Sequence, residues 1–153
     1  MTSEHSEKIP ENKPMTKERL EKYISCKEEI TELEYLLAHL GEGDTMIDND
    51  VIYDYQTGFP RPQTVVGFDQ KKYEQRKRRY EKRKLMLEKE CEEIEEFVEA
   101  IPDSLTRRIF RMYFINGIDQ QSVADRVHLD RSRISRRIDE YLKNAHKAHN
   151  AHV

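Results

Sequence analysis

Apolar side chains recur at alternating steps of three and four along two long segments of the chain. This spacing marks one side of an α-helix and forms the seam along which two helices pack lengthwise, as in a coiled coil. Asp69 precedes the second segment and is predicted to be its N-cap. The ladder positions are Tyr23, Cys26, Ile30, Leu33, Leu37 and Leu40 in the first segment, which starts at Thr16, and Tyr73, Tyr80, Leu87, Cys91, Ile94, Val98 and Ile101 in the second.

Charge predicts how these two helices pair. Residues 71–84 hold nine basic and two acidic side chains, whereas residues 87–101 hold seven acidic and one basic. The first helix has the same order along the chain, with Lys17, Arg19 and Lys22 early and Glu28, Glu29, Glu32 and Glu34 late. Antiparallel packing therefore places each block against its opposite sign. We therefore expect a long antiparallel helical hairpin over 15–101. Its two helices are joined by a connection over 41–68, in which Pro60 and Pro62 exclude a regular helix. A short extended element at 63–68 is compatible with this connection. The basic block 71–84 fits either a solvated helix face or a contact with phosphate.

Residues 102–144 show the pattern of three shorter helices. Asp103, Asp119 and Asp130 each stand where an N-cap is expected, and Asn116 with Gly117 ends the first of the three. A short connection separates the second helix from the third, as in a helix-turn-helix. The predicted fold class is all-α: the hairpin, then a C-terminal three-helix domain. Its inner positions are Leu105, Ile109, Met112, Tyr113, Val123, Ala124, Val127, Ile134, Ile138, Tyr141 and Leu142.

Four arginines lie between residues 131 and 137, and their angles on the third helix predict a DNA-binding face. With 100° per residue, Ser132, Arg133 and Arg136 lie opposite the apolar stripe, where they can contact bases in the major groove. The expected phosphate contacts lie at the flanks and on the preceding helix: Arg131, Ser135, Arg137, Gln120 and Gln121. Residues 102–144 carry a net charge of +3 in a chain whose total is −3.

Residues 101–144 resemble the promoter-recognising C-terminal domain, region 4, of bacterial sigma factors. The family pattern is matched by Ile101-Pro102, Tyr113-Phe114, Val123-Ala124 and the run Leu129 to Ile134. The whole layout is similar to the ArpU/RinA-type late transcription regulators of bacteriophages and prophages. The resemblance implies promoter DNA as ligand, and it implies a left-handed backbone at His128, where the family turn usually has glycine. Asp130 replaces the usual serine or threonine cap and adds a negative charge near the expected phosphates.

Composition narrows the class of function. With 36% hydrophobic and 37% charged residues, the chain has little material for a globular core, which favours an elongated helical protein. No glycine-rich phosphate loop or nucleophile triad is present, so we expect no enzyme, no catalytic residue and no cofactor. Cys26 and Cys91 lack metal-ligand spacing and are expected to be buried reduced thiols.

The two ends of the chain are predicted to be tails. Residues 1–14 are polar and aperiodic and are expected to be disordered, and residues 145–153 are expected to be a flexible tail. His146, His149 and His152 share a helical face there, but three histidines without a carboxylate or thiolate are more often polar surface residues than a metal site. No stretch approaches the roughly 18 apolar residues of a membrane span, and no secretory signal is evident, so a cytoplasmic location is expected.

Three functional hypotheses follow from these features. The first is a sequence-specific transcriptional regulator of phage or prophage type, which binds double-stranded DNA through the helix starting near Arg131. RNA polymerase and a second copy of the chain, paired through the hairpin, are further candidate partners. The second is a packaging protein similar to a terminase small subunit, which binds DNA as a ring. The third is a helical protein-interaction adaptor without nucleic acid.

Overall fold

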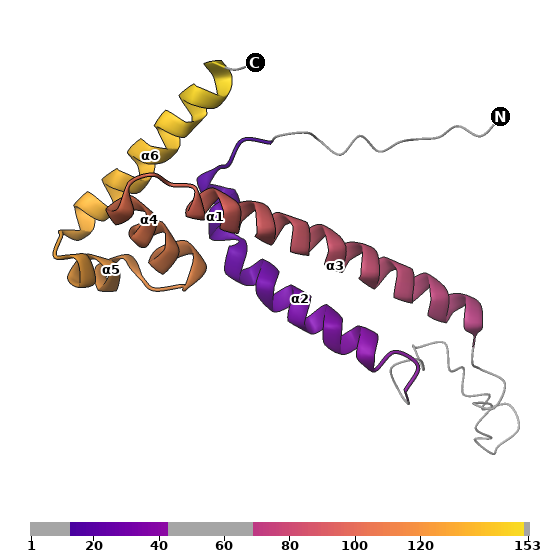
Figure 1. Cartoon of the computed structure of the whole chain (residues 1–153). Coiled ribbons are helices and arrows are strands. Elements are labelled where there is room, and N and C mark those ends of the chain that lie inside the picture. The colour runs from indigo at the N-terminus through magenta and orange to yellow at the C-terminus, as the bar shows by residue number, and fades with distance from the viewer. Residues whose placement is uncertain (1–12, 43–68, 152–153) are drawn as a thin grey trace, which may run out of the picture. The chain divides into compact units, whose positions relative to one another are not determined.

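The described residues of this computed structural model, 13–42 and 69–151, are all-α. Their helices are α1 (Lys17–Glu21), α2 (Tyr23–Ala38), α3 (Gln70–Glu99), α4 (Ser104–Phe110), the π-helical turn η4 (Arg111–Ile115), α5 (Gln120–Val127) and α6 (Arg131–Ala151) (Figure 1). The chain divides into two compact units, one of residues 1–24 with 92–153 and one of residues 25–91. No helix within the described ranges is long and apolar enough to cross a bilayer. The extended element predicted at 63–68 lies outside the described residues.

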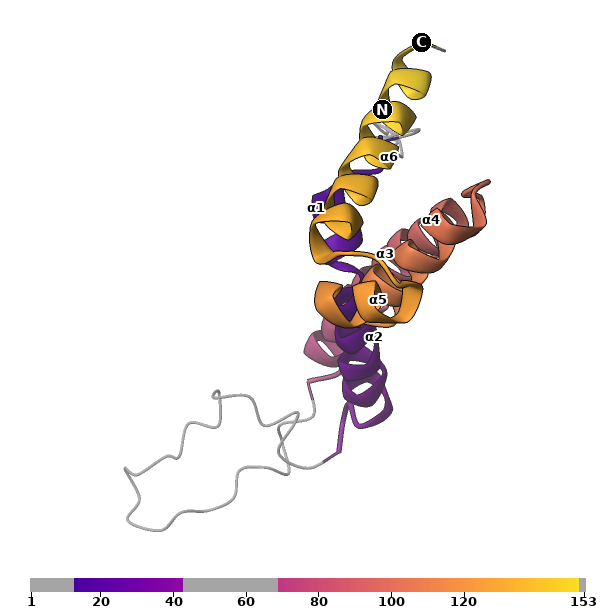
Figure 2. The same ribbon diagram turned by 90° about the vertical axis from the view of Figure 1, so that its left-hand side faces the viewer.

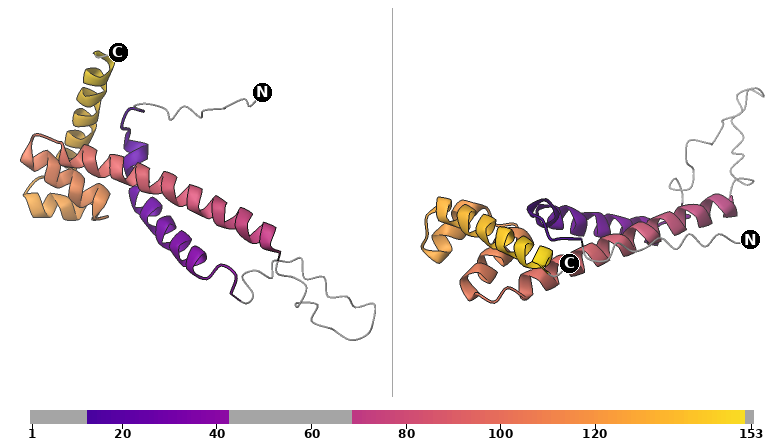
Figure 3. Two further views of the ribbon diagram at one scale, coloured as in Figure 1. Left: turned by 45° about the vertical axis from the view of Figure 1, so that its right-hand side comes forward. Right: turned by 90° about the horizontal axis from the view of Figure 1, so that it is seen from above.

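The unit of residues 25–91 is built from most of α2 and the larger part of α3 (Figure 3). Ile30, Leu33 and Cys91 are buried, as the predicted ladder requires, and Cys26 is half-buried. The Nζ of Lys84 lies 3.6 Å from a carboxylate oxygen of Glu34 on α2 and 3.6 Å from one of Glu88. Lys77 and Lys84 stand at the two positions of the α3 ladder that no apolar residue fills, so the buried ladder residues of α3, Cys91, Ile94 and Val98, all lie in its C-terminal half.

The predicted first helix is interrupted at Lys22. Thr16 caps α1, because its side chain accepts a hydrogen bond from the backbone N–H of Arg19. The backbone N–H of Lys22 then bonds the carbonyl oxygen of Arg19 at 3.2 Å, three residues back. Such a tighter turn ends α1 before α2 begins at Tyr23, so the prediction of one continuous helix was wrong at this point. The short helix is anchored by Leu20, which is fully buried.

The other unit contains α4, α5 and α6 packed against one another (Figures 1 and 2). The predicted N-caps are confirmed for two of these helices: Asp103 accepts from the N–H of Thr106, and Asp119 accepts from the N–H of Ser122. Side chains at the predicted inner positions of α5 and α6 form the core with residues from α3 and α4. Those that are fully buried, together with Ile101 between α3 and α4, are Ile94, Val98, Ile109, Phe110, Val123, Ala124, Ile134 and Ile138.

The π-helical turn changes the side chains that enter this core. Met112 and Tyr113 were predicted to be inner residues but are only half-buried, whereas Phe110 and Phe114 are buried. In η4 the N–H of Asn116 bonds the carbonyl of Arg111 at 2.9 Å, five residues back. A π-helical turn holds more residues than the 3.6 of an α-helix, so side chains beyond it leave the α-helical register. This change of spacing accounts for Phe114, which follows the buried Ile109 by five residues. Phe110 lies before the turn, and the prediction missed it because it assigned the inner side to Leu105, Ile109, Met112 and Tyr113.

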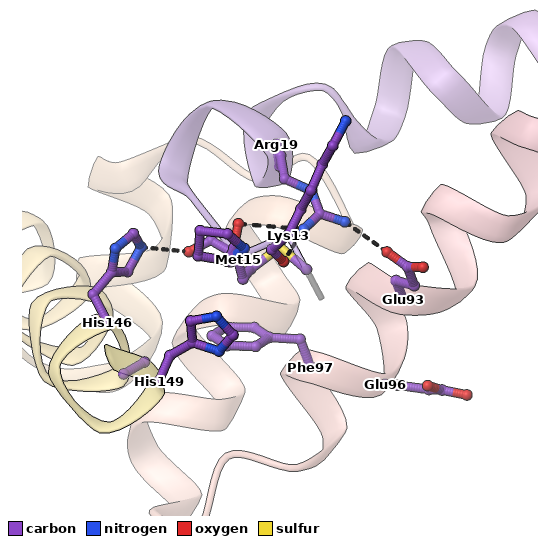
Figure 4. A pocket seen from close by; sticks show the side chains of 10 residues that line it. Lys13, Met15, Arg19, Glu93, Glu96, Phe97, His146 and His149 are labelled. Carbon is purple, nitrogen blue, oxygen red and sulfur yellow. Dashed lines mark hydrogen bonds and ion pairs between the residues drawn. The ribbon is translucent and has the colours of Figure 1, made fainter. Parts of the chain in front are cut away.

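The predicted C-terminal tail is helical, because α6 continues to Ala151. The segment before α1 supplies a packing partner for this part of α6. The ring of His146 donates from Nε2 to the backbone carbonyl of Met15 at 2.8 Å. His146 and His149 also line a cavity of about 490 Å³ with Lys13, Met15, Arg19 and Phe97 (Figure 4). The prediction of a flexible tail over 145–153 is therefore wrong for 145–151.

We predict that Gly117→Ala destabilises the protein by about 1–2 kcal/mol. Gly117 has a φ of +71°, a left-handed conformation that costs about this much for a residue with a Cβ. An added Cβ would also lie 2.7 Å from Cδ1 of Ile24. Urea unfolding of both single variants and of the Ile24→Ala/Gly117→Ala pair separates these effects, because Ile24→Ala removes only the steric part. A Gly117→Ala variant as stable as the wild type would contradict the prediction.

Candidate nucleic-acid interface

The amino-terminal half of α6 presents arginines on the side opposite its buried stripe. Ile134, Ile138 and Leu142 are buried in the unit, at steps of four residues. The predicted base-contacting residues, Ser132, Arg133 and Arg136, are all exposed, and so is Arg131. Within the described part of the chain, none of the guanidinium groups of Arg131, Arg133 and Arg136 forms an ion pair. These side chains are therefore available to an external ligand.

Arg137 differs from the other three arginines because it contacts the protein itself. Its Nη1 lies 3.3 Å from a carboxylate oxygen of Asp103 and 3.4 Å from the hydroxyl oxygen of Thr106. These contacts join α6 to the start of α4, and the side chain of Arg137 is 40% exposed. A guanidinium has five N–H donors, so this contact uses only part of its capacity. Ser135, also predicted to contact phosphate, is half-buried.

The turn between α5 and α6 has the left-handed residue that the sigma-factor resemblance implies. His128 has φ 59° and ψ 41°, which confirms that expectation. The N–H of Leu129 bonds the carbonyl of Ala124 at 3.0 Å, a bond typical of a Schellman helix end. Asp130 directly precedes α6, and its carbonyl accepts from the N–H of Arg133 at 2.9 Å. The turn at His128 and Leu129 therefore leads through Asp130 directly into the first turn of α6.

The two glutamines predicted to contact phosphate lie at the beginning of α5. Gln120 is half-buried and Gln121 is exposed. The side-chain amide of Gln121 donates to a carboxylate oxygen of Asp125 at 3.0 Å, which orients the amide along the surface of α5. Gln120 and Gln121 are therefore the first two residues of α5, the helix that packs against α6.

Two capping carboxylates stabilise the helices behind this face. The hydroxyl and the backbone N–H of Thr106 lower the pKa of Asp103, and Arg137 lowers it further. Hydrogen bonds from the backbone N–H and hydroxyl of Ser122 lower the pKa of Asp119. Burial raises the pKa of Tyr141, whose ring packs edge-on against Phe110. Both caps are therefore held in the anionic form.

The structure adds residues to this face that the sequence did not predict as site residues. Ser132 and Arg136 line a shallow depression on α6 together with Ser135, Asp139, Glu140 and Lys143. Lys17 of α1 reaches the same region, because its Nζ lies 3.3 Å from a carboxylate oxygen of Asp139. Helical spacing alone would place Lys143 on this side of α6, because it lies seven residues after Arg136 and four after Asp139. Lys17 is 122 positions away from Asp139, and no local pattern connects the two.

The described residues contain no group of three His, Cys, Asp or Glu side chains arranged to hold a metal ion. Comparison of the chain with protein-family models, with curated proteins and with solved structures gives no match.

The two lowered carboxyl pKa values predict acid destabilisation. Each cap stabilises the fold above the unfolded-state pKa of about 4, and this contribution is lost as the pH falls through the lower folded-state pKa. Asp103→Asn retains a capping side chain but removes the titration, so its stability should fall less steeply below about pH 4. Asp119→Asn should act in the same way at the other cap. Urea unfolding at several pH values tests this, and an unchanged acid limb in the double variant would contradict it.

Proposed function

We propose that the chain is a sequence-specific DNA-binding protein that inserts the amino-terminal half of α6 into the major groove. In this proposal α5, the turn at His128 and α6 form a helix-turn-helix, with α6 as the recognition helix. The observation that carries the proposal is the exposure of Arg133 and Arg136 on α6, opposite its buried stripe, together with the exposure of Arg131 in the first turn of the helix. Three exposed arginines in the amino-terminal part of α6, none of which forms an ion pair with another described residue, fit a polyanion best.

The proposed base contacts come from Arg136, Arg133 and Ser132. Arginine can donate two hydrogen bonds to O6 and N7 of guanine, a pattern that only the major groove offers. Ser132 can donate to or accept from a base edge. Because these residues occupy the outer side of one helix, a single insertion of α6 brings all three to base edges.

The proposed phosphate contacts surround this recognition helix. Arg131 lies in the first turn of α6, where the helix dipole adds to its positive charge. Ser135, Gln120 and Gln121 contribute polar donors at the sides. Arg137 has a double role in this proposal: it binds Asp103 within the protein and uses its remaining donors for phosphate.

The α2 and α3 helices serve in this proposal as an antiparallel helical arm. The ion pair between Lys84 and Glu34 joins the basic end of the charge pattern on α3 to the acidic end of that on α2, as antiparallel packing predicts. Such an arm can hold a second copy of the chain or contact RNA polymerase. The sigma-factor and ArpU/RinA resemblance supports regulation of transcription in a phage or prophage as the biological setting.

The proposal predicts different effects for two arginine variants. Arg136→Ala should reduce affinity for the selected site by about 1–3 kcal/mol and relax specificity at one base pair. Arg131→Ala should weaken binding to all sequences alike and reduce the dependence of log affinity on log salt by about one. Selection of bound fragments from genomic DNA, followed by titrations at several salt concentrations, measures both quantities.

The two variants serve as controls for each other, because each removes one guanidinium from the same helix. Equal effects of both on every sequence would leave only nonspecific electrostatic binding. The absence of salt-dependent DNA binding by the wild-type protein at low ionic strength would exclude the proposal and favour a protein-interaction role.

A further inference from the structure

The proposed recognition helix carries two carboxylates close to its arginines. Asp139 and Glu140 line the same shallow depression as Ser132 and Arg136. Duplex DNA carries one negative charge per about 1.7 Å of its length, so an uncompensated carboxylate on this side would oppose binding. Asp139 is compensated within the protein, by a residue from the other end of the chain.

Lys17 of α1 supplies that compensation. Its ammonium lies 3.3 Å from a carboxylate oxygen of Asp139, and the side chains of the pair are 37% and 58% exposed. An ion pair this exposed contributes little to folding stability. The ion pair nevertheless changes the charge of the α6 surface, because Lys17 places a cation beside the recognition face whether or not the pair stabilises the fold.

The position of Lys17 is fixed by its neighbours. Met15 accepts the hydrogen bond from His146, which lies seven residues after Asp139 and therefore on the same side of α6 (Figure 4). Arg19 binds a carboxylate oxygen of Glu93 on α3 at 2.7 Å and donates to the carbonyl of Lys13 at 2.9 Å. Residues 13–20 thus form a strap along α6, and the strap holds Lys17 next to Asp139.

We infer that the strap is part of the DNA-binding surface. Lys17 neutralises Asp139 and, together with Lys143 one helical turn further along α6, binds a backbone phosphate beside the groove that Arg136 enters. This inference rests on the proposed function, and it adds a phosphate contact from a segment outside residues 102–144. Among the described residues of the strap, Lys17 is the lysine that forms an ion pair with α6, and the inference gives this pair a role.

The test measures DNA affinity and its salt dependence for Lys17→Ala and Asp139→Asn. Lys17→Ala should reduce affinity roughly three- to tenfold at 0.1 M salt and lower the salt slope by about one. Asp139→Asn should raise affinity about twofold or more, because a negative charge leaves the surface. In the Asp139→Asn background, Lys17→Ala should cost less than it does alone, because no carboxylate is uncovered.

Lys22→Ala is the matched control, since it removes one exposed cation just beyond the strap without breaking an ion pair that joins α1 to α6. Lys17→Arg should retain wild-type affinity and salt slope. Equal effects of Lys17→Ala and Lys22→Ala, with no gain from Asp139→Asn, would overturn the inference while leaving DNA binding intact. If Lys17→Ala fails to fold, the Asp139→Asn and Lys17→Arg measurements still decide. A wild-type protein that does not bind DNA would instead refute the proposed function.

Discussion

Burial of one apolar stripe on α6 determines where the other side chains of this helix point. The helix has 21 residues and is rich in charge, so Ile134, Ile138 and Leu142 are the side chains that can join the core of α4 and α5. Burying a side chain of this size contributes about 1.5–3 kcal/mol, far more than an exposed ion pair. Apolar burial therefore sets the rotation of α6 about its axis, and the outward direction of the arginines is a consequence. The proposed DNA contact depends on that rotation.

The positive face is local in a chain whose total charge is negative. Three acidic residues near it are used as caps or are paired: Asp103 and Asp119 accept hydrogen bonds at helix ends, and Asp139 pairs with Lys17. These three carboxylates thus stabilise the scaffold or are compensated, while Arg131, Arg133 and Arg136 stay exposed. A net charge of −3 is compatible with the proposed DNA binding, because electrostatic attraction to DNA acts over about 10 Å at 0.1 M salt.

Much of this arrangement follows from local rules. The caps at Asp69, Asp103 and Asp119, the ladder of the long helices and the outward angle of Arg136 depend only on residues within one or two turns, and the sequence predicts them correctly. The π-helical turn at 111–115 and the interruption at Lys22 depend on how neighbouring segments pack, which periodicity does not contain. The extension of α6 to Ala151 and the contact of Lys17 with Asp139 join distant parts of the chain. Pairings at such separations lie beyond any pattern within a single element.

The central claim is that the outer face of α6 lies in the major groove. Dimethyl sulfate probing of a bound DNA fragment tests it directly, because the reagent methylates guanine N7 in the major groove and adenine N3 in the minor groove. The account predicts protection of guanine N7 within the bound site and unchanged reactivity of adenine N3. Protection of adenine N3 alone, or a bound site with no protected guanine, would contradict it.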